Sequence, residues 1–314
     1  MAGSYEDINY SLRPAKQIER KMICEAISRL GEFGTIETYR YVGFGSIYFS
    51  DFSLFHKKLH LSNMVSIEKD EHKRARFEFN KPYDCIDMKF GHSTKILPTM
   101  SWEQRSILWL DYDGKLDGDS LADIGSFCAN AVSGSMLIVT VNAHFSATDK
   151  NRLGELREEI GAEMVPIDLG ESDLAGWNAS KAMRRIITNV IQKGLNQRNG
   201  VRKVGSRLLW KPILSFEYQD GAKMTTIGGV LIDEGNEPHF MRCNFQALEF
   251  VRSNSEESYR IDIPALTYRE LRYLDQHLPA GDLALVESLG IPPRDVNQYA
   301  RIYRYFPNFA EAEL

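Results

Sequence analysis

The sequence predicts an α/β protein whose mostly parallel sheet ends in an antiparallel hairpin and carries helices on both faces. Five strand-like runs alternate with helix-like segments between residues 38 and 141, the succession from which parallel sheets are built. Two longer strand-like runs follow, and Asp220-Gly221 between them is a strong hairpin-turn signal. Together these observations favour one sheet of five parallel strands closed by an antiparallel pair.

The elements follow one another in a regular order. A helix is expected over 14–31, because Pro14 suits a first turn and apolar residues recur at helical spacing. Parallel strands are expected at 38–44, 63–68, 84–89, 106–110 and 136–141. The intervening helices are expected at 50–60, 70–79, 93–98 and 119–131. The run 106–110 is continuously apolar, as buried parallel strands are.

The chain divides into three predicted parts. Residues 1–34 form an N-terminal helical segment, 35–232 the α/β domain, and 233–314 a mostly helical extension packed on the main domain. Within the domain, 149–200 is expected to be helical, most clearly from Met183 to Leu195, and the hairpin strands are expected at 208–218 and 222–232. The extension shows helical patterns at 268–277 and 280–289, and Pro292-Pro293 begins a last segment.

Composition excludes several classes of protein. The content of 43% hydrophobic and 26% charged residues is that of a globular protein, and the net charge of −5 argues against a generally basic nucleic-acid-binding surface. The four cysteines form no C-x-x-C pair, and His56 and His60 have no evident third partner, so no metal site is expected. Without a signal peptide or a membrane-spanning run, we expect a cytoplasmic protein that does not contact a membrane.

A glycine turn is the most informative local feature. Gly43-Phe44-Gly45-Ser46 lies between a strand-like and a helix-like run, where glycine lets the backbone approach a ligand closely. A second apolar strand ends in Glu68, a carboxylate 23 positions after Gly45. This layout is typical of an α/β half-domain that binds a nucleotide or nucleoside. Tyr48 holds the last position of G-x-G-x-x-G, which disfavours a nicotinamide cofactor.

Residues 35–232 resemble class I S-adenosylmethionine-dependent methyltransferases. Gly43 and Gly45 match the first two glycines of that family's G-x-G-x-G loop, whereas Ile47 stands at the third. Tyr41 replaces the acidic residue that usually precedes the first glycine by two positions. The resemblance implies a Rossmann-like methyltransferase sheet, S-adenosylmethionine as cofactor and methyl transfer as the activity.

The resemblance also assigns roles to single residues. Glu68 would hold the ribose hydroxyls, Gly91-His92-Ser93 would lie near the adenine, and Asp111, which ends the fourth strand, would stand at the reacting centre. The cofactor-binding residues implied are Tyr41, Gly43, Gly45, Ser46, Glu68, Lys69, His92, Ser93 and Asp111.

The catalytic and acceptor-binding residues are expected beside Asp111. Asp111 or Asp113 could take a proton from the acceptor, and Tyr112 could stack on a planar substrate. Substrate contacts are expected from four residues outside this segment: Arg13, Lys16, Asn142 and His144. The leading expectation is a nucleic acid or nucleotide-like acceptor, because the stretch 181–211 carries nine Lys or Arg and no Asp or Glu.

Three alternatives stay open. The acceptor could be the hydroxyl of a small molecule, because no acceptor-specific motif is present and the D-P-P-Y tetrad of amino-group DNA methyltransferases is absent. The irregular glycine loop is also compatible with an inactive module that binds a nucleotide or a protein partner. Finally, Asp111-Tyr112-Asp113-Gly114 resembles the opening motif of haloacid-dehalogenase-like phosphatases, in which Asp111 and Asp113 would surround Mg²⁺. The sequence does not indicate an oligomeric state.

Overall fold

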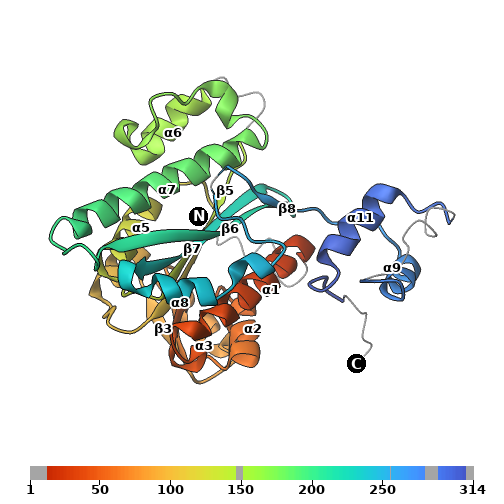
Figure 1. The fold of residues 1–314 in the computed structure, drawn as a ribbon, viewed down its shortest axis with the longest axis horizontal. Coiled ribbons are helices and arrows are strands. Elements are labelled where there is room, and N and C mark those ends of the chain that lie inside the picture. Colours follow the sequence, from red (N-terminus) through yellow and green to blue (C-terminus); the bar gives the residue numbers. More distant parts are fainter. Residues whose placement is uncertain (1–12, 146–150, 255, 280–288, 309–314) are drawn as a thin grey trace.

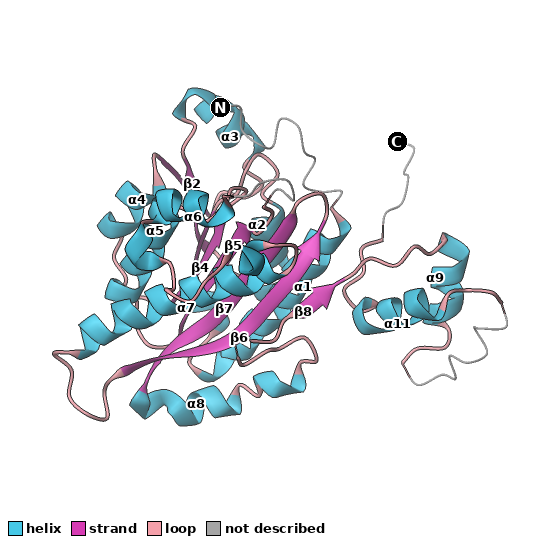
Figure 2. Ribbon diagram, turned by 90° about the horizontal axis from the view of Figure 1, so that it is seen from above, coloured by secondary structure: helices cyan, strands magenta, loops and turns pink. Residues whose placement is uncertain are grey.

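A single eight-stranded sheet organises the protein (Figures 1 and 2). The structure is a computed structural model that describes residues 13–145, 151–254, 256–279 and 289–308. The strand order is β3-β2-β1-β4-β5-β7-β6-β8. The strands are β1 (Arg40–Gly43), β2 (Asn63–Glu68), β3 (Ile86–Phe90), β4 (Ser106–Asp111), β5 (Ser135–Asn142), β6 (Leu208–Gln219), β7 (Lys223–Asp233) and β8 (Tyr259–Ile261).

The topology confirms the predicted fold class. Strands β1 to β5 pair in parallel, with β1 between β2 and β4. The hairpin joins them in reverse order, because β7 pairs antiparallel with both β5 and β6 and so lies between them. Gly221 in the hairpin turn has a φ of +136°, a conformation that glycine adopts without steric cost. The predicted turn at Asp220-Gly221 is therefore confirmed.

Helices cover both faces of the sheet. They are α1 (Pro14–Ser28), α2 (Ser50–Leu59), α3 (Arg74–Asn80), α4 (Ser93–Ile96), α5 (Gly118–Asn130), α6 (Arg152–Ile160), α7 (Asn178–Asn199), α8 (Glu237–Arg242), α9 (Tyr268–Asp275) and α11 (Pro293–Ile302). Helices α1, α2 and α8 lie on one side of the strands and α5 and α7 on the other (Figure 1).

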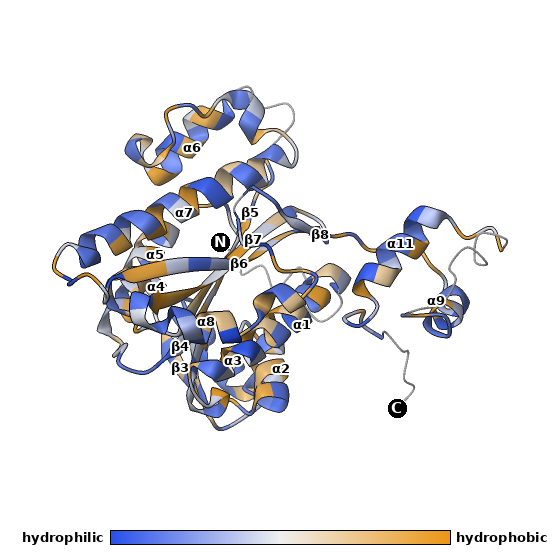
Figure 3. Cartoon of the chain, in the orientation of Figure 1, coloured by the Kyte–Doolittle hydropathy of each residue, from blue (hydrophilic) through white to orange (hydrophobic). Residues whose placement is uncertain are grey.

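Strand alternation produces two hydrophobic cores. In β4, Ile107 and Trp109 face the core shared with α1 and α2, whereas Leu108 and Leu110 face the core shared with α5 and α7. Successive side chains of a strand point to opposite faces, so one apolar run supplies both layers. Apolar residues accordingly gather on the strands and on the inner sides of the helices (Figure 3).

The predicted N-terminal helix docks on the hairpin through Asp220. The backbone N–H groups of Ala15 and Lys16 donate to the two Asp220 carboxylate oxygens at 3.1 and 2.9 Å. Arg13, at the N-cap position, makes no side-chain capping bond, so Asp220 performs that role from a distant part of the chain.

We expect Asp220→Ala to destabilise the protein by about 1 kcal/mol, because it leaves two helix-end amides without their acceptor. Urea denaturation followed by far-ultraviolet circular dichroism measures the loss. Asp84→Ala, at an exposed position, is the matched control and should leave the midpoint unchanged. Equal midpoints for the two variants would contradict the docking role.

The C-terminal extension combines a strand with two helices. β8 pairs in parallel with β6 at the sheet edge, and neither β8 nor α8 was predicted. Helices α9 and α11 share a small core of their own around Leu274, Val296 and Tyr299, and both views place them beside β8, away from the main sheet (Figures 1 and 2). The helix expected at 280–289 falls almost entirely outside the described residues. In the described part of the chain, no helix has the length and apolar character to cross a membrane.

Candidate active site

A cavity of about 580 Å³ opens at the carboxyl ends of the parallel strands. Residues that follow β1, β2, β3 and β4 all line it. They include Gly45, Glu68, His92, Ser93, Asp111 and Tyr112. The sheet thus brings together most of the site residues that the sequence predicted, although they span nearly seventy positions of the chain.

The glycine turn is tight and leaves no room for side chains. A Cβ atom on Gly45 would lie 2.6 Å from the Phe49 ring and 2.7 Å from Ser66 Oγ. The Gly45 N–H donates to the same Ser66 oxygen at 3.1 Å. A Cβ on Gly43 would lie 2.6 Å from the Tyr41 hydroxyl. Ile47, at the place of the third glycine, packs near Phe77 and is not among the residues that line the cavity.

Tyr41 does not reach the cavity, and Asp51 does. Tyr41 is fully buried, and its hydroxyl donates to the Asp51 carboxylate in the first turn of α2. Burial and the neighbouring Asp51 raise the pKa of Tyr41 well above its usual value. Burial also raises the pKa of Asp51, while the charge of Arg20 opposes that shift. Asp51 and Arg20 both line the cavity, and the sequence analysis assigned neither to the site.

Glu68 ends β2 at the edge of the cavity. Its Oε1 accepts the backbone N–H of Asp70 at 3.0 Å. Burial raises the pKa of Glu68, because desolvation disfavours the carboxylate. Lys69 lies next to it in the cavity lining and is exposed.

The segment after β3 supplies a third wall. Ser93 is buried at the start of α4, and its hydroxyl lowers the pKa of the Asp123 carboxyl of α5, which burial raises. His92 is exposed, with its Nε2 3.6 Å from an Asp119 carboxylate oxygen. Both residues line the cavity.

Asp111 lines the cavity, and its carboxylate bonds the ammonium group of the buried Lys16. The Lys16 ammonium lies 2.6 Å from Asp111 Oδ1, 2.8 Å from Glu19 Oε2 and 3.1 Å from the Tyr218 hydroxyl. The Lys16 side chain is 1% exposed, whereas that of Asp111 is 25% exposed. Lys16 is therefore placed beneath Asp111 and not in position to touch a substrate directly.

A buried polar chain continues from this ion pair into the sheet. Glu19 accepts a hydrogen bond from the Thr226 hydroxyl, Thr226 bonds Thr140 at 2.8 Å, and Trp109 Nε1 donates to Thr140 at 3.1 Å. The Lys16 ammonium also lies 4.7 Å from the centre of the Trp109 ring. A buried polar network of this kind restricts side-chain positions, so Asp111 is held in place at the cavity.

Aromatic side chains flank Asp111. The Phe44 and Tyr112 rings lie 5.3 Å apart between centroids. The Tyr112 hydroxyl donates to Asp123 at 2.6 Å, and burial together with Asp123 raises the pKa of Tyr112. Asp113 lines the same part of the cavity and is exposed.

The other predicted substrate residues lie outside the cavity lining. Arg13 faces Asp220, with 3.8 Å between Nε and the carboxylate. The side-chain oxygen of Asn142 accepts a hydrogen bond from the backbone N–H of His144 at 2.7 Å. The backbone N–H of Asn142 donates to the carbonyl of Gly114. His144 is exposed beyond the end of β5. These positions keep Asn142 and His144 near the mouth without placing them in the cavity wall.

Acidic groups dominate the cavity. Its acidic residues are Asp51, Glu68, Asp70, Asp111, Asp113, Asp117 and Asp119. Its Lys and Arg residues are Arg20, Lys69 and Lys115. Seven carboxylates against three cations favour a ligand that carries positive charge.

The family and structural comparisons agree with this geometry. Residues 8–314 match the model of a family described as "Putative O-methyltransferase". No curated protein sequence matches the chain. Trm1 from Pyrococcus horikoshii, solved with S-adenosyl-L-methionine, superposes with a TM-score of 0.50 at 12% identity over 76% of this chain and 60% of that one. TYW2 from M. jannaschii, solved with AdoMet, has a TM-score of 0.38 at 11% identity over 73% and 80% of the two chains.

The Trm1 likeness concerns the fold alone, and this chain spans about 60% of the length of that protein. The family match covers nearly the whole chain. The match is to a methyltransferase family and not to a phosphatase family, and the Lys16 ammonium already engages one carboxylate oxygen of Asp111. The chain therefore belongs to this family, whose members are described as putative O-methyltransferases.

Proposed function

We propose that the protein methylates a hydroxyl group of a small acceptor that carries no phosphate near the reacting atom. The acidic lining around Asp111 carries this proposal, because seven carboxylates repel a polyanion and accept a neutral or cationic molecule. The family description as an O-methyltransferase supports oxygen as the acceptor atom.

The described residues fit the cofactor. Glu68 offers a carboxylate that can accept hydrogen bonds from two ribose hydroxyls. Gly45 lines the cavity without a side chain, so its backbone can approach the ligand. Ser93 and His92 border the adenine end. When bound, S-adenosylmethionine supplies a methyl group on a positively charged sulfur, which the acidic lining stabilises.

The acceptor side of the cavity is built from Phe44, Tyr112 and Asp111. The two rings form an apolar wall on which a flat acceptor can pack. Their positions are fixed, because Tyr112 is tied to Asp123 and Phe44 belongs to the glycine turn. This wall selects for an aromatic or otherwise planar acceptor.

Asp111 is the group that handles the acceptor proton. The second Asp111 carboxylate oxygen, which Lys16 does not engage, would take up the hydroxyl proton of the acceptor as that oxygen is methylated. Lys16 acts through Asp111 and is a positioning residue, because its ammonium bonds the other carboxylate oxygen at 2.6 Å. Correct orientation supplies much of the rate in such a transfer.

A nucleic-acid acceptor, the first expectation from the sequence, is the second candidate. Four of the nine Lys or Arg residues in the stretch 181–211 that suggested it are paired with carboxylates in the structure. The ion pairs are Lys181–Glu256, Arg184–Glu217, Arg185–Asp168 and Lys211–Glu237. Internal pairing of these cations reduces what the stretch can offer to phosphates.

Transfer of a tritiated methyl group from S-adenosylmethionine tests the proposal. The acceptor panel contains phenols and catechols, nucleosides, and total RNA with and without nuclease. We expect label in hydroxylated aromatic molecules, little change between low and high salt, and loss of transfer in Asp111→Asn. Label found only in RNA, and weakened steeply by salt, would establish the second candidate instead.

Cofactor affinity should fall as the pH is lowered. Burial raises the pKa of Glu68, so its carboxylate takes up a proton at a higher pH than an ordinary glutamate does. The protonated group is a poorer acceptor for ribose hydroxyls, and affinity is retained only above that pKa. Calorimetry with S-adenosylhomocysteine from about pH 8 to about pH 5 measures the effect. Glu68→Gln should remove most of the dependence, and an affinity that is constant with pH in the wild type would refute the role of Glu68.

A further inference from the structure

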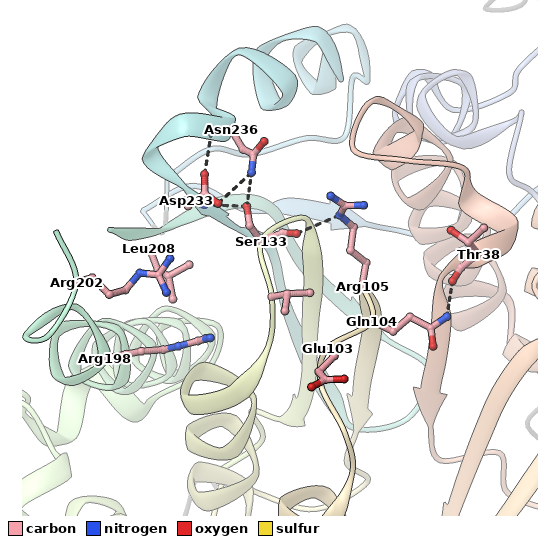
Figure 4. Close-up of a pocket in the computed structure, with 11 residues that line it drawn as sticks. Thr38, Glu103, Gln104, Arg105, Ser133, Arg198, Arg202, Leu208, Asp233 and Asn236 are labelled. Atoms are coloured by element: carbon pink, nitrogen blue, oxygen red, sulfur yellow. Dashed lines mark hydrogen bonds between the residues drawn. The ribbon is translucent and has the colours of Figure 1, made fainter. Parts of the chain in front are cut away.

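A second cavity, of about 630 Å³, lies at the opposite end of the sheet (Figure 4). It is formed where β4, β5 and β6 begin and β7 ends. Its lining residues include Thr38, Gln104, Arg105, Ser133, Arg198 and Arg202. A cavity of this size accommodates a small molecule, and the methyltransferase site at the carboxyl ends of the strands does not include it.

Three arginines converge on this cavity from different elements. Arg198 and Arg202, at the end of α7 and just beyond it, enter from one side, and Arg105 precedes β4 on the other (Figure 4). Each is held by a neutral backbone carbonyl: Arg105 by Ser133 at 3.1 Å, Arg198 by Ala131 at 2.6 Å and Arg202 by Ser206 at 2.5 Å. All three side chains are half-buried.

No carboxylate of the described residues forms an ion pair with Arg105, Arg198 or Arg202. Asp233, in the same cavity, is engaged with Asn236. In the first half of the basic stretch 181–211, by contrast, Lys181, Arg184 and Arg185 all form ion pairs with acidic residues. Burial lowers the pKa of Arg198, and the charge of the neighbouring Arg202 lowers it further.

Three half-buried guanidinium groups converge on a cavity whose two carboxylates, Glu103 and Asp233, form no ion pair with them, and such a cluster is suited to an anion. A planar guanidinium presents several N–H donors in a fork that matches phosphate oxygens, and the backbone carbonyls use only part of that fork. Hydroxyl and amide side chains also line the cavity, at Thr38, Gln104, Ser133 and Asn236, together with the carboxylates of Glu103 and Asp233. The lining contains no aromatic ring on which a base could stack.

We propose that this cavity binds a small phosphorylated ligand of the sugar-phosphate or pyrophosphate class, through Arg198, Arg202 and Arg105. The ligand's phosphate oxygens neutralise the arginine cluster, and its hydroxyl groups meet the polar side chains. Because the cavity lies away from the acidic methyltransferase site, the proposal is independent of the acceptor assigned above.

Isothermal titration calorimetry of the full chain with pyrophosphate and with glucose 6-phosphate tests this site. We expect a Kd below about 1 mM for at least one probe, weakened about tenfold or more in Arg202→Gln through loss of a charged hydrogen bond. Arg185→Gln is the matched control, because Arg185 lies on the same helix α7 in an exposed pair with Asp168. Arg202→Gln should bind S-adenosylhomocysteine as the wild type does, which verifies folding.

Two results would overturn the proposal. One is the absence of binding of either probe to the wild type at about 10 mM, a concentration at which even weak sites are detected. The other is equal weakening by Arg185→Gln and Arg202→Gln, which would reveal non-specific attraction to the basic helix. Arg198→Gln is a supporting variant only, since Arg198 also bonds carbonyls at the end of α5 and its loss affects that helix.

Discussion

Replacing Glu68 by alanine is expected to weaken the binding of S-adenosylhomocysteine by about 100-fold. The carboxylate is placed to accept two hydrogen bonds from the ribose, and each bond to a charged group contributes about 1.5–3 kcal/mol. A loss of about 3 kcal/mol corresponds to about two factors of ten in affinity. Isothermal titration calorimetry measures it, and the product is used so that no turnover occurs.

Glu71→Ala provides the matched control for this prediction. Glu71 is an exposed glutamate three positions along the chain that does not line the cavity. We expect its affinity to stay within a factor of two of the wild type, about 0.4 kcal/mol. Binding that survives Glu68→Ala unchanged would remove the cofactor assignment from this end of β2. An equal loss in both variants would point to an effect of net charge.

Lys16→Met should destabilise the fold by about 3–5 kcal/mol, the usual cost of breaking a buried ion pair. Lys16 is the cation between Glu19 and Asp111, and it is almost wholly buried. Without it, the Glu19 carboxylate is left in the core beside Asp111, and methionine replaces only the aliphatic stem. Urea denaturation measures the free energy of unfolding, with S-adenosylhomocysteine absent.

Two further variants make this second prediction specific. Lys57→Met removes an exposed lysine of α2 and should change stability by less than about 0.5 kcal/mol. Lys16→Met combined with Glu19→Gln should recover part of the loss, because the unpaired buried charge is removed with the cation. A loss of under about 1 kcal/mol in Lys16→Met would contradict the buried ion pair.

Local signals were sufficient for much of the fold. The bounds of β2 were predicted without error, and the Asp220-Gly221 turn, the glycine loop and the carboxylates ending β2 and β4 all follow from short stretches of sequence. These features depend on period-two alternation, on φ values that glycine favours and on the common edge reached by parallel strands. The sheet then brought Gly45, Glu68 and Asp111 to one cavity, as expected.

Long-range pairings account for what the sequence did not reveal. In the sequence, Asp51 is an ordinary acidic residue in the first turn of a helix. Only the structure shows that the Tyr41 hydroxyl donates a hydrogen bond to it. Lys16 was predicted to contact the substrate, and only the docking of α1 by Asp220 buries it beneath Asp111. β8 was not predicted because three residues are too few to show a strand period. In each case the deciding partner lies elsewhere in the sequence, or the segment is too short to show a pattern.

The most direct measurement is a crystal structure of the protein with S-adenosylhomocysteine. We predict that the ribose hydroxyls lie within hydrogen-bond distance of Glu68, the adenine beside Ser93, and the sulfur toward Asp111 and the Phe44–Tyr112 wall. A ligand bound in that cavity with its ribose away from Glu68, or one bound elsewhere on the sheet, would contradict the account.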